Sequence, residues 1–549
     1  MNNFRLPLTL CVSVFLLGIN VPVSACSSIL ISRGASADGS VIITYACDGE
    51  YHPHLNRTPA ADYEPGDSLE IKHWSGEIWG KIAPVPHTYA YVGLMNEHQL
   101  AIGETTFDGR QELQNPDGVL HYWHLMKFAL QRAKTAREAI EVITGLVDEY
   151  GYRSTGESFS IADPDEAWIM EMIGPGPGGQ SAIWVALKVP DGYICAHCNK
   201  ARIGEFPLND PENCRYSENV ITFAIEKGYY DPKSGKPFRF CDVYCPPTPK
   251  NRRYAETRVW SIFRRAAPSM NLSPDYHRAV EGSQPYPLWI KPDHKLSAAD
   301  VFSLMRDHYE GTDYDMTQGI DAGPYGTPNR WRPITWMDED SVEYTWERPI
   351  STQQTGFSFV SQSRSWLPDA VGGVLWYGFD DTYTCCYVPL YCCIDDLPKS
   401  YTVGKLSRFS WDSAWWVFNF AANFANIKYS FMIKDIQAVQ SELEGKAFAL
   451  QPAVEMTAVE LWKSDPQLMV RHLTDYSVNY AEIVVERWRE LGELLVTKYN
   501  DGYVQDEEGR PHDSGGYPDN WLKEVVKSRP DQFKLKPKEE DVPESRLVD

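Results

Sequence analysis

Cys26 is the residue whose type and position most favour chemistry in this sequence. It directly follows Val23-Ser24-Ala25, a run of small residues typical of a signal-peptide cleavage site. Arg5 gives the preceding segment a positive start, and an apolar stretch runs from Leu6 to Ile19. The pattern therefore predicts that residues 1–25 are an export signal and that the mature chain begins with Cys26.

A cysteine at the start of a chain carries two reactive groups. Its thiol has a reference pKa of about 8.5 and its α-amine one of about 7.7–8.0, so the amine can act as a base near neutral pH. One residue can thus supply both the nucleophile and the base for amide hydrolysis. The reaction also needs donors for the developing oxyanion and an acid that holds the amine. We expect these groups to lie close to Cys26.

The same leader admits a second interpretation. Val-Ser-Ala-Cys also satisfies a bacterial lipoprotein signal, in which the cysteine thiol is lipidated and the amine is acylated. Under that interpretation Cys26 anchors the protein and catalyses nothing. The leader alone does not decide between the two, so the residues after Cys26 must.

Composition argues against some classes of function. The 549 residues carry a formal net charge of −23, which makes nucleic acid a poor partner because phosphates attract basic surfaces. The apolar run of the leader is short for a membrane span and no second one follows, so we expect no integral span after processing. Of twelve cysteines, ten remain once Cys11 leaves with the leader and Cys26 is reserved as nucleophile. An even number makes disulfides conceivable in an oxidising compartment.

Cysteine and histidine also occur at a spacing that suits metal ligands. Cys195-Ala-His197-Cys198 could bind a metal, and Cys241 and Cys245 could complete a zinc site. The spacing matches no standard zinc framework, and the pairs Cys385-Cys386 and Cys392-Cys393 are more typical of buried or disulfide-bonded residues. We therefore expect neither a metal nor an organic cofactor.

Strand patterns follow the leader directly. Residues 27–33 and 40–45 are rich in β-branched and apolar residues, and Ala37-Asp38-Gly39 between them is a turn signal. This predicts a hairpin with Cys26 at the exposed start of its first strand. A second strand pair is expected at 89–94 and 100–105.

The remaining patterns predict an α+β fold. Two helices are expected next, the second capped by Thr135 and Glu138. Residues 231–251 are rich in Pro, Lys and Cys and suggest a surface insertion.

We divide the chain into a leader (1–25), a catalytic domain (26–400), a helical region packed on it (401–528) and a disordered tail (529–549). Further strands are expected at 158–162, 167–172, 183–189 and 193–197 and within 356–388, and a helical apolar stripe at Ala481, Val484, Trp488, Leu491 and Leu495.

Several spaced blocks of sequence follow Cys26 in a recognisable order. The blocks are Cys26-Ser-Ser-Ile-Leu-Ile, Gly34-Ala-Ser-Ala-Asp38-Gly39-Ser40, Tyr45-Ala-Cys-Asp48, Gly93-Leu-Met-Asn96-Glu97-His98, Ala101-Ile-Gly-Glu104, Lys134 to Ile140, His197-Cys-Asn199-Lys-Ala-Arg202-Ile, Thr257-Arg258-Val-Trp260 and Arg306 to Thr312. In this order they resemble the dipeptidase A and secernin family of N-terminal-nucleophile (Ntn) hydrolases, which are related to penicillin V acylase and bile salt hydrolase. The resemblance extends from Cys26 to about Tyr499.

The resemblance implies a role for each matching residue. Cys26 matches the nucleophile and Asp48 the acid near its amine. Asn96 and Asn199 match asparagines of the oxyanion site, and Arg258 matches an active-site arginine, with Arg202, Arg264 and Arg265 as nearby alternatives. The family fold implied is a four-layer αββα sandwich.

The residues themselves leave other roles open, and one position departs from the family. Asp48 could cap a turn, Asn96 could occupy one, and Arg258 could form a structural ion pair. Many family members carry arginine three residues before the acid, where this chain has Tyr45. Loss of that cation weakens the electrostatic support for a thiolate.

The function that we expect is hydrolysis of dipeptides by an exported periplasmic or extracellular enzyme, through a thioester on Cys26. Its partners would be small peptides and a second copy of the chain. A free substrate amine requires a carboxylate, for which Asp48, Glu104 and Glu171 are candidates, and Arg258 is the candidate for the substrate carboxylate. One alternative is an Ntn acylase of acyl amino acids or conjugated bile acids. Another is a non-catalytic binding protein with a lipid anchor on Cys26.

Overall fold

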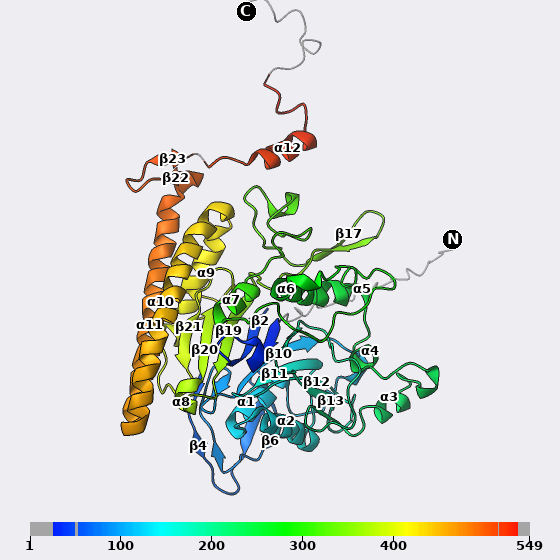
Figure 1. Ribbon diagram of the computed structural model, residues 1–549. Helices are drawn as coiled ribbons and strands as arrows, with labels where there is room; N and C mark the ends of the chain where they lie inside the picture. The colour runs from blue at the N-terminus through cyan, green and yellow to red at the C-terminus, as the bar shows by residue number, and fades with distance from the viewer. Residues whose placement is uncertain (1–25, 50–52, 514, 536–549) are drawn as a thin grey trace, which may run out of the picture.

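Two antiparallel β-sheets form the centre of the computed structural model, which describes residues 26–49, 53–513 and 515–535 (Figure 1). The predicted export signal, and the tail beyond residue 535, lie outside the described residues. Helices are placed against both sheets, so the α+β class is confirmed.

The first sheet contains the strand that follows Cys26. Its seven strands lie in the order β16 (Trp289–Ile290), β14 (Ile194–His197), β1 (Ser28–Ile31), β2 (Val41–Asp48), β19 (Thr355–Ser363), β20 (Val374–Phe379) and β21 (Val388–Tyr391).

The second sheet packs face to face with the first. Its eight strands lie in the order β15 (Cys214–Tyr216), β13 (Ile183–Lys188), β12 (Ala167–Ile173), β11 (Gly156–Ala162), β10 (Ala101–Phe107), β9 (Met95–Asn96), β8 (Tyr91–Val92) and β3 (Arg57–Thr58). Four two-stranded sheets complete the described strands: β4 (Ala61–Asp62) with β7 (His87–Thr88), β5 (Leu69–Lys72) with β6 (Ile78–Ile82), β17 (Thr335–Met337) with β18 (Glu343–Thr345), and β22 (Val504–Gln505) with β23 (Pro511–Asp513).

The two sheets contact each other where β1 and β2 face β10, β11 and β12. Gly103 on β10 permits this close approach. A Cβ atom there would lie 3.0 Å from Cβ of Tyr45 and 3.2 Å from the carbonyl oxygen of Thr44. Because Gly103 has no side chain, the next residue of β10, Glu104, is brought close to β2.

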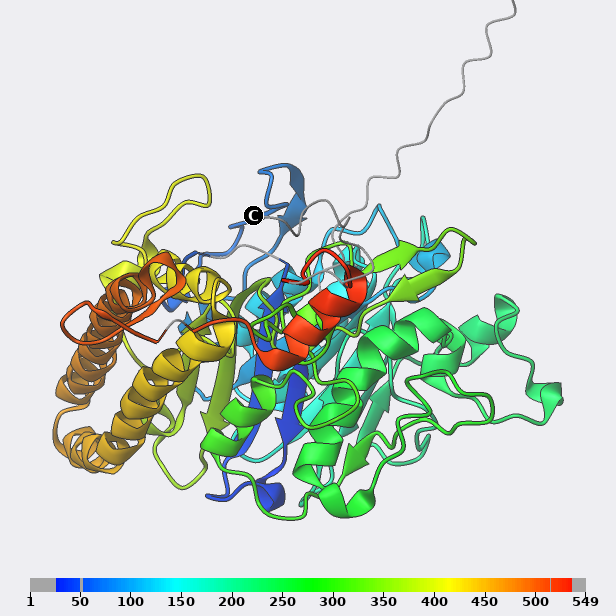
Figure 2. The same cartoon turned by 90° about the horizontal axis from the view of Figure 1, so that it is seen from above.

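Helices cover the outer face of each sheet. Apolar side chains of α1 (Tyr122–Arg132) and α2 (Ala136–Tyr150) pack with the eight-stranded sheet. On the other side, α7 (Ala298–Met305) contacts β19, α9 (Ala414–Ala425) contacts β20, and α11 (Pro466–Lys498) contacts β21. Figure 2 shows the long helices α10 (Tyr429–Ser464) and α11 side by side at one edge. The other helices are α3 (Thr222–Glu226), α4 (Phe240–Tyr244), α5 (Pro249–Asn251), α6 (Thr257–Ala266), α8 (Asp369–Gly372) and α12 (Asp519–Ser528).

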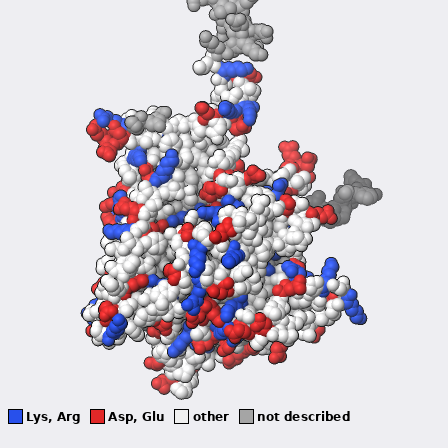
Figure 3. All heavy atoms as spheres, viewed as in Figure 1, with Lys and Arg blue, Asp and Glu red and all other residues white. Residues whose placement is uncertain are grey.

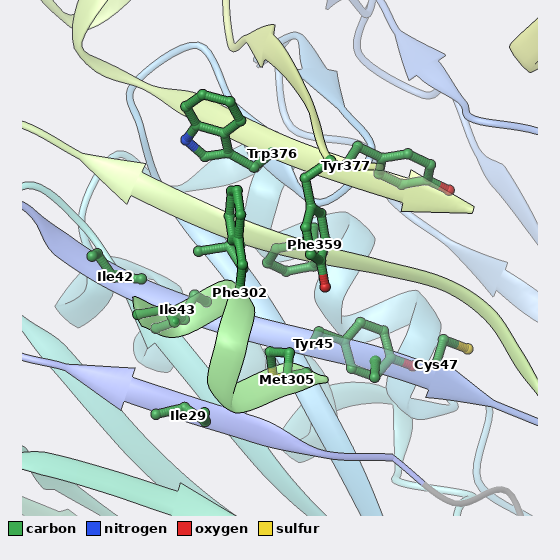
Figure 4. Close-up of a cluster of buried hydrophobic side chains, with 14 of the residues drawn as sticks. Ile29, Ile42, Ile43, Tyr45, Cys47, Phe302, Met305, Phe359, Trp376 and Tyr377 are labelled. Atoms are coloured by element: carbon green, nitrogen blue, oxygen red, sulfur yellow. The ribbon is translucent and has the colours of Figure 1, made fainter. Parts of the chain in front are cut away.

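An apolar core joins the seven-stranded sheet to its helix layer. The ring centroid of Phe302 on α7 lies 5.5 Å from that of Trp376 on β20 (Figure 4). Ile29, Ile42 and Ile43 on β1 and β2 are fully buried nearby. Their large apolar side chains fix β1 and β2, and therefore the position of Cys26, within the structure.

Several predicted elements are confirmed. β1 and β2 form the hairpin that the turn signal predicts, and β11 to β14 lie where strands were expected. The hydroxyl of Thr135 accepts from the backbone N–H of Glu138 at 3.2 Å, which caps α2. The stripe from Ala481 to Leu495 is fully buried along α11. The division into domains stays a prediction.

Two predictions need correction. The segment 89–94 is not one strand but contains β8 and a turn before β9, because Gly93 has a φ of 55°. The segment 231–251 is only partly a surface insertion: α4 lies in it, and Cys241 and Cys245 are buried in the main core.

The described surface carries both signs of charge. On the face shown in Figure 3, acidic and basic side chains lie among one another. Within residues 26–49, 53–513 and 515–535, no helix combines the length and apolar character that crossing a bilayer requires.

Candidate active site

Cys26 lies two residues before β1, where the chain continues the pairing of β1 with β2. Ser27 bridges to Ala46 of β2, and the amide of Ala46 donates to the carbonyl of Ser27 at 3.0 Å. The expectation that Cys26 is exposed is wrong, because its relative exposure is 1%. The contact of the two sheets encloses it.

The thiol of Cys26 faces a carboxylate and a phenol. Its Sγ lies 3.6 Å from Oε1 of Glu104 on β10 and 3.9 Å from Oη of Tyr45 on β2. Tyr45 donates to the same Glu104 oxygen at 2.5 Å, and Ser28 donates to the Glu104 carbonyl at 3.3 Å. At the position where the resemblance implies an arginine, this chain therefore has a phenol that donates to a carboxylate.

This environment keeps the thiol protonated. Burial raises the pKa of Cys26 well above its ordinary value, and the neighbouring Cys47, Glu104 and Asp48 raise it further. A base must therefore remove the proton before the sulfur can attack a carbonyl.

Asn199 contacts the backbone nitrogen of that same cysteine. Cys26 N donates to Oδ1 of Asn199 at 2.9 Å, and Nδ2 of Asn199 donates to the carbonyl of Thr106 at 2.7 Å. The residue has a φ of 63°, in the left-handed region that asparagine tolerates better than most residues. The turn after β14 thus places the amide oxygen of Asn199 at hydrogen-bonding distance from the backbone nitrogen that the predicted removal of residues 1–25 would expose as an α-amine.

Arg258 on α6 joins the start of β1 to the turn that carries Asn199. Its guanidinium donates to the Cys26 carbonyl at 2.6 Å and to Ser27 Oγ at 3.0 Å. It also donates to the carbonyl of Cys198 and to Oδ1 of Asn199, both at 2.9 Å. Arg258 is fully buried and committed to these acceptors, so the sequence-based idea that it binds a substrate carboxylate is not supported.

Asp48 at the end of β2 belongs to a separate buried pair. Arg348 donates to Oδ2 of Asp48, and Thr355 Oγ1 donates to Oδ1 at 2.5 Å. Burial raises the pKa of Asp48, and the charge of Arg348 opposes that rise. Among the described residues, no hydrogen bond joins the carboxylate to Cys26. Sequence reasoning did not single out Arg348, because no motif marks the loop that carries it.

Asn96 takes its hydrogen bonds from other parts of the chain. Its Nδ2 donates to the carbonyls of Leu130 and Ala133 at the end of α1, both at 2.8 Å. Its Oδ1 accepts from the amides of His98 at 3.0 Å and Leu100 at 3.1 Å. These contacts hold the turn after β9 against the helix layer. The oxyanion role of Asn96 stays a prediction, which none of these four hydrogen bonds supports.

Glu171 on β12 is also not brought to Cys26. Its carboxylate accepts from the backbone amides of Arg202 at 2.5 Å and Ile203 at 3.1 Å. Burial raises its pKa to about 7. Of the two substrate-binding candidates, only Glu104 makes a contact with Cys26 among the described residues, whereas Glu171 anchors the segment that follows Asn199.

The cysteine and histidine spacing around residue 197 has a structural explanation. Both ring nitrogens of His197 bond to hydroxyls, Nδ1 to Thr105 and Nε2 to Ser160, each at 2.7 Å. Burial lowers the pKa of His197 to about 3, so the ring is neutral. No group of three or more His, Cys, Asp or Glu side chains suited to a metal occurs in the part of the chain that the structure describes.

An open cavity of about 770 Å³ lies beside Asn199. Asn199, Thr106 and residues of the β17–β18 hairpin line it. Lys250 and Arg332 also line it and supply positive charge. The cavity is large enough to hold a small molecule next to Asn199.

Comparison with known proteins identifies the family. The model of Peptidase family C69 matches residues 70–442. A probable dipeptidase of Latilactobacillus sakei is 26% identical over 401 residues, covering 69% of this chain and 77% of that protein. A probable dipeptidase of Salmonella dublin is 27% identical over 405 residues, covering 69% and 83%. A dipeptidase of Bifidobacterium longum is 25% identical over 436 residues, covering 71% and 75%.

The family match contains Glu104, Asn199, Arg258 and Arg348 but begins after Cys26. It covers more than half of the sequence. The chain therefore belongs to peptidase family C69.

Proposed function

We propose that this protein is an exported dipeptidase whose nucleophile is the thiol of Cys26, and that its two facing sheets with outer helices are the αββα sandwich of an Ntn hydrolase. The names of the C69 relatives support a dipeptide substrate. One observation carries the proposal furthest: the Glu104 carboxylate lies 3.6 Å from Cys26 Sγ.

This distance suits a substrate with a free amine. In a dipeptide the α-amine is two bonds from the carbonyl carbon that is cleaved. When Sγ bonds to that carbon, the ammonium group necessarily lies within a few ångströms of the sulfur. A buried carboxylate at that place compensates a charge whose burial would otherwise cost several kcal/mol. Glu104 thereby selects substrates with an unblocked amine.

The proposed reaction begins after removal of residues 1–25. The new α-amine of Cys26, held by Oδ1 of Asn199, takes the proton of the thiol. The sulfur attacks the amide carbonyl, and the ammonium group of Cys26 returns its proton to the leaving amine. Water then attacks the thioester with the amine as base, which releases the acid and restores the thiol. Arg258 fixes the Cys26 backbone throughout.

The far end of a dipeptide carries a carboxylate. Since Arg258 is committed elsewhere, we assign this charge to Lys250 and Arg332 in the cavity beside Asn199. Lys250 also pairs with Glu343 at 3.2 Å across the rim.

The test uses protein that begins at Cys26, with the N-terminus verified by mass spectrometry. We expect hydrolysis of free dipeptides and a kcat/KM lower by one to several orders of magnitude for their N-acetyl forms. Cys26→Ala should abolish turnover, and protein that retains residue 25 should be inactive. Preference for N-acetyl dipeptides or a conjugated bile acid would assign the protein to the acylases instead. A lipidated Cys26 would support the binding-protein alternative.

A further inference from the structure

Cys47 on β2 lies directly opposite the nucleophile. The pairs Leu30 with Ile43 and Ser27 with Ala46 define one continuous antiparallel register between β1 and β2. One step further along this register pairs Cys26 with Cys47. Directly opposite residues of antiparallel strands point to the same face of the sheet.

The hydrogen bonding shows which kind of pair this is. The amide of Ala46 donates to the carbonyl of Ser27, so Ser27 and Ala46 form a hydrogen-bonded pair. Such pairs alternate with non-hydrogen-bonded pairs, so Cys26 and Cys47 belong to the second kind. In that kind the Cα atoms are about 4.5 Å apart and the side chains approach most closely. Disulfides form at Cα separations of roughly 4.4–6.8 Å.

Contacts at the site agree with this placement. The thiols of Cys26 and Cys47 are within hydrogen-bond reach of each other. Among the described residues, Cys198 also lies beside the first strand, but its thiol contacts the side chain of Ser27, which points to the face opposite that of Cys26. Cys47 is therefore the partner that β-sheet geometry offers to the nucleophile.

We infer that Cys26 and Cys47 form a reversible modification site, at which a mild oxidant joins the two sulfurs in a cross-strand disulfide and switches the nucleophile off. The reaction removes one hydrogen from each thiol and forms one S–S bond. The two hydrogens reduce the oxidant, which is a diazene or a second disulfide such as oxidised glutathione. A dithiol reductant reverses the step by thiol–disulfide exchange.

The consequence is a peptidase that a mild oxidant inactivates and a dithiol reductant reactivates. A sulfur that is bonded to Cys47 has no proton to give up and cannot attack a carbonyl. The α-amine and Asn199 are unchanged by the bridge, so reduction alone restores the site. This inference concerns the thiol pair itself and can be tested whether or not dipeptides are the substrate.

The experiment maps disulfides in protein that begins at Cys26. The protein is treated with diamide, residual thiols are blocked with iodoacetamide, and the digest is analysed by mass spectrometry without reduction. We expect a cross-linked peptide pair that contains Cys26 and Cys47, and we expect dithiothreitol to remove it. Recovery of Cys26 as the alkylated thiol, or in a bridge to another cysteine, would overturn the inference.

Variants separate this bridge from general thiol damage. In Cys47→Ser, Cys26 should stay open to iodoacetamide after diamide treatment, whereas Cys214→Ser, a buried cysteine of the other sheet, should behave like wild type. Circular dichroism checks that each variant is folded, and Cys47→Ala replaces Cys47→Ser if it is not. Equal protection of Cys26 in wild type and in the folded Cys47 variant would contradict the proposed partner.

Discussion

Arg348 and Asp48 form a fully buried ion pair although 300 residues separate them in the chain. Asp48 ends β2, and Arg348 lies in the loop that leads to β19, the next strand of the same sheet. The pair therefore fastens this loop to the strand that carries Tyr45 and Cys47. It also places a cation beside the predicted acid in a chain that lacks the arginine of many relatives at position 45.

Breaking this pair should destabilise the fold strongly. Arg348→Met leaves the Asp48 carboxylate buried without its partner, which typically costs about 3–5 kcal/mol. Urea denaturation followed by circular dichroism should show that loss. The double variant Arg348→Met/Asp48→Asn should recover part of it because the orphaned charge is gone. Arg264→Met, at a partly exposed arginine of α6, serves as the control. Equal loss in the single and double variants would contradict a charge-based role.

Glu104→Gln tests recognition of the substrate amine. The neutral amide keeps the shape of the side chain but removes the charge beside Cys26. We expect kcat/KM for free dipeptides to fall by at least tenfold, equivalent to about 1.4 kcal/mol. The ratio of kcat/KM for free dipeptides to that for N-acetyl dipeptides should also become smaller. Glu157→Gln is a matched control, because Glu157 is a buried acid on the neighbouring strand β11. A uniform fall for free and blocked substrates would show that Glu104 acts on the thiol rather than on the amine.

The two asparagines should differ in what they affect. Asn96→Ala leaves two carbonyls and two amides without the partner they now have, so it should lower the free energy of unfolding by about 1–3 kcal/mol or more. Asn199→Ala removes the acceptor at Cys26 N and should lower kcat. Urea denaturation and steady-state kinetics on the same samples separate these effects. A folded Asn96→Ala protein with kcat reduced a hundredfold would restore the oxyanion role.

Local patterns were sufficient to predict much of the fold. The turn at Asp38-Gly39 predicts the first hairpin because it needs only neighbouring residues. Thr135 predicts the start of α2 for the same reason, and the 3.6-residue period around Trp488 predicts the buried face of α11. The leader before Cys26 and the sequence blocks after it predict that Cys26 is the nucleophile. Each of these signals is contained in a short stretch of chain.

The contacts of the site could not be predicted in this way. Asn96 was expected near Cys26, but a strand residue can face either layer, and its side chain bonds to the end of α1 instead. Arg348 reaches Asp48 only because the loop before β19 passes the end of β2. The contact of Tyr45 with Glu104 depends on the spacing of two sheets at Gly103. These are long-range relationships, which residue types and spacing do not specify.

The stability of the protein should carry a pH dependence from Glu171. Burial raises its pKa to about 7 from an ordinary value of 4.5. Between these values the folded protein keeps a proton that the unfolded chain releases. The stabilisation is therefore fully present below about pH 4.5 and is lost as pH rises through 7. A shift of this size corresponds to roughly 3 kcal/mol.

Glu171→Gln removes this titration, so the comparison with wild type isolates it. The free energy of unfolding, measured in urea at about pH 5 and pH 8, should fall more between the two pH values in wild type than in the variant. Two other buried groups also change the free energy of unfolding with pH, but equally in both proteins. Burial raises the pKa of Asp380 to about 8, so Asp380 lowers stability as pH rises, as Glu171 does. Burial lowers the pKa of His197 to about 3, so His197 has the opposite effect. Their contributions therefore cancel in the difference. An identical pH dependence in the two proteins would mean that the amides of Arg202 and Ile203 keep Glu171 ionised in the folded state.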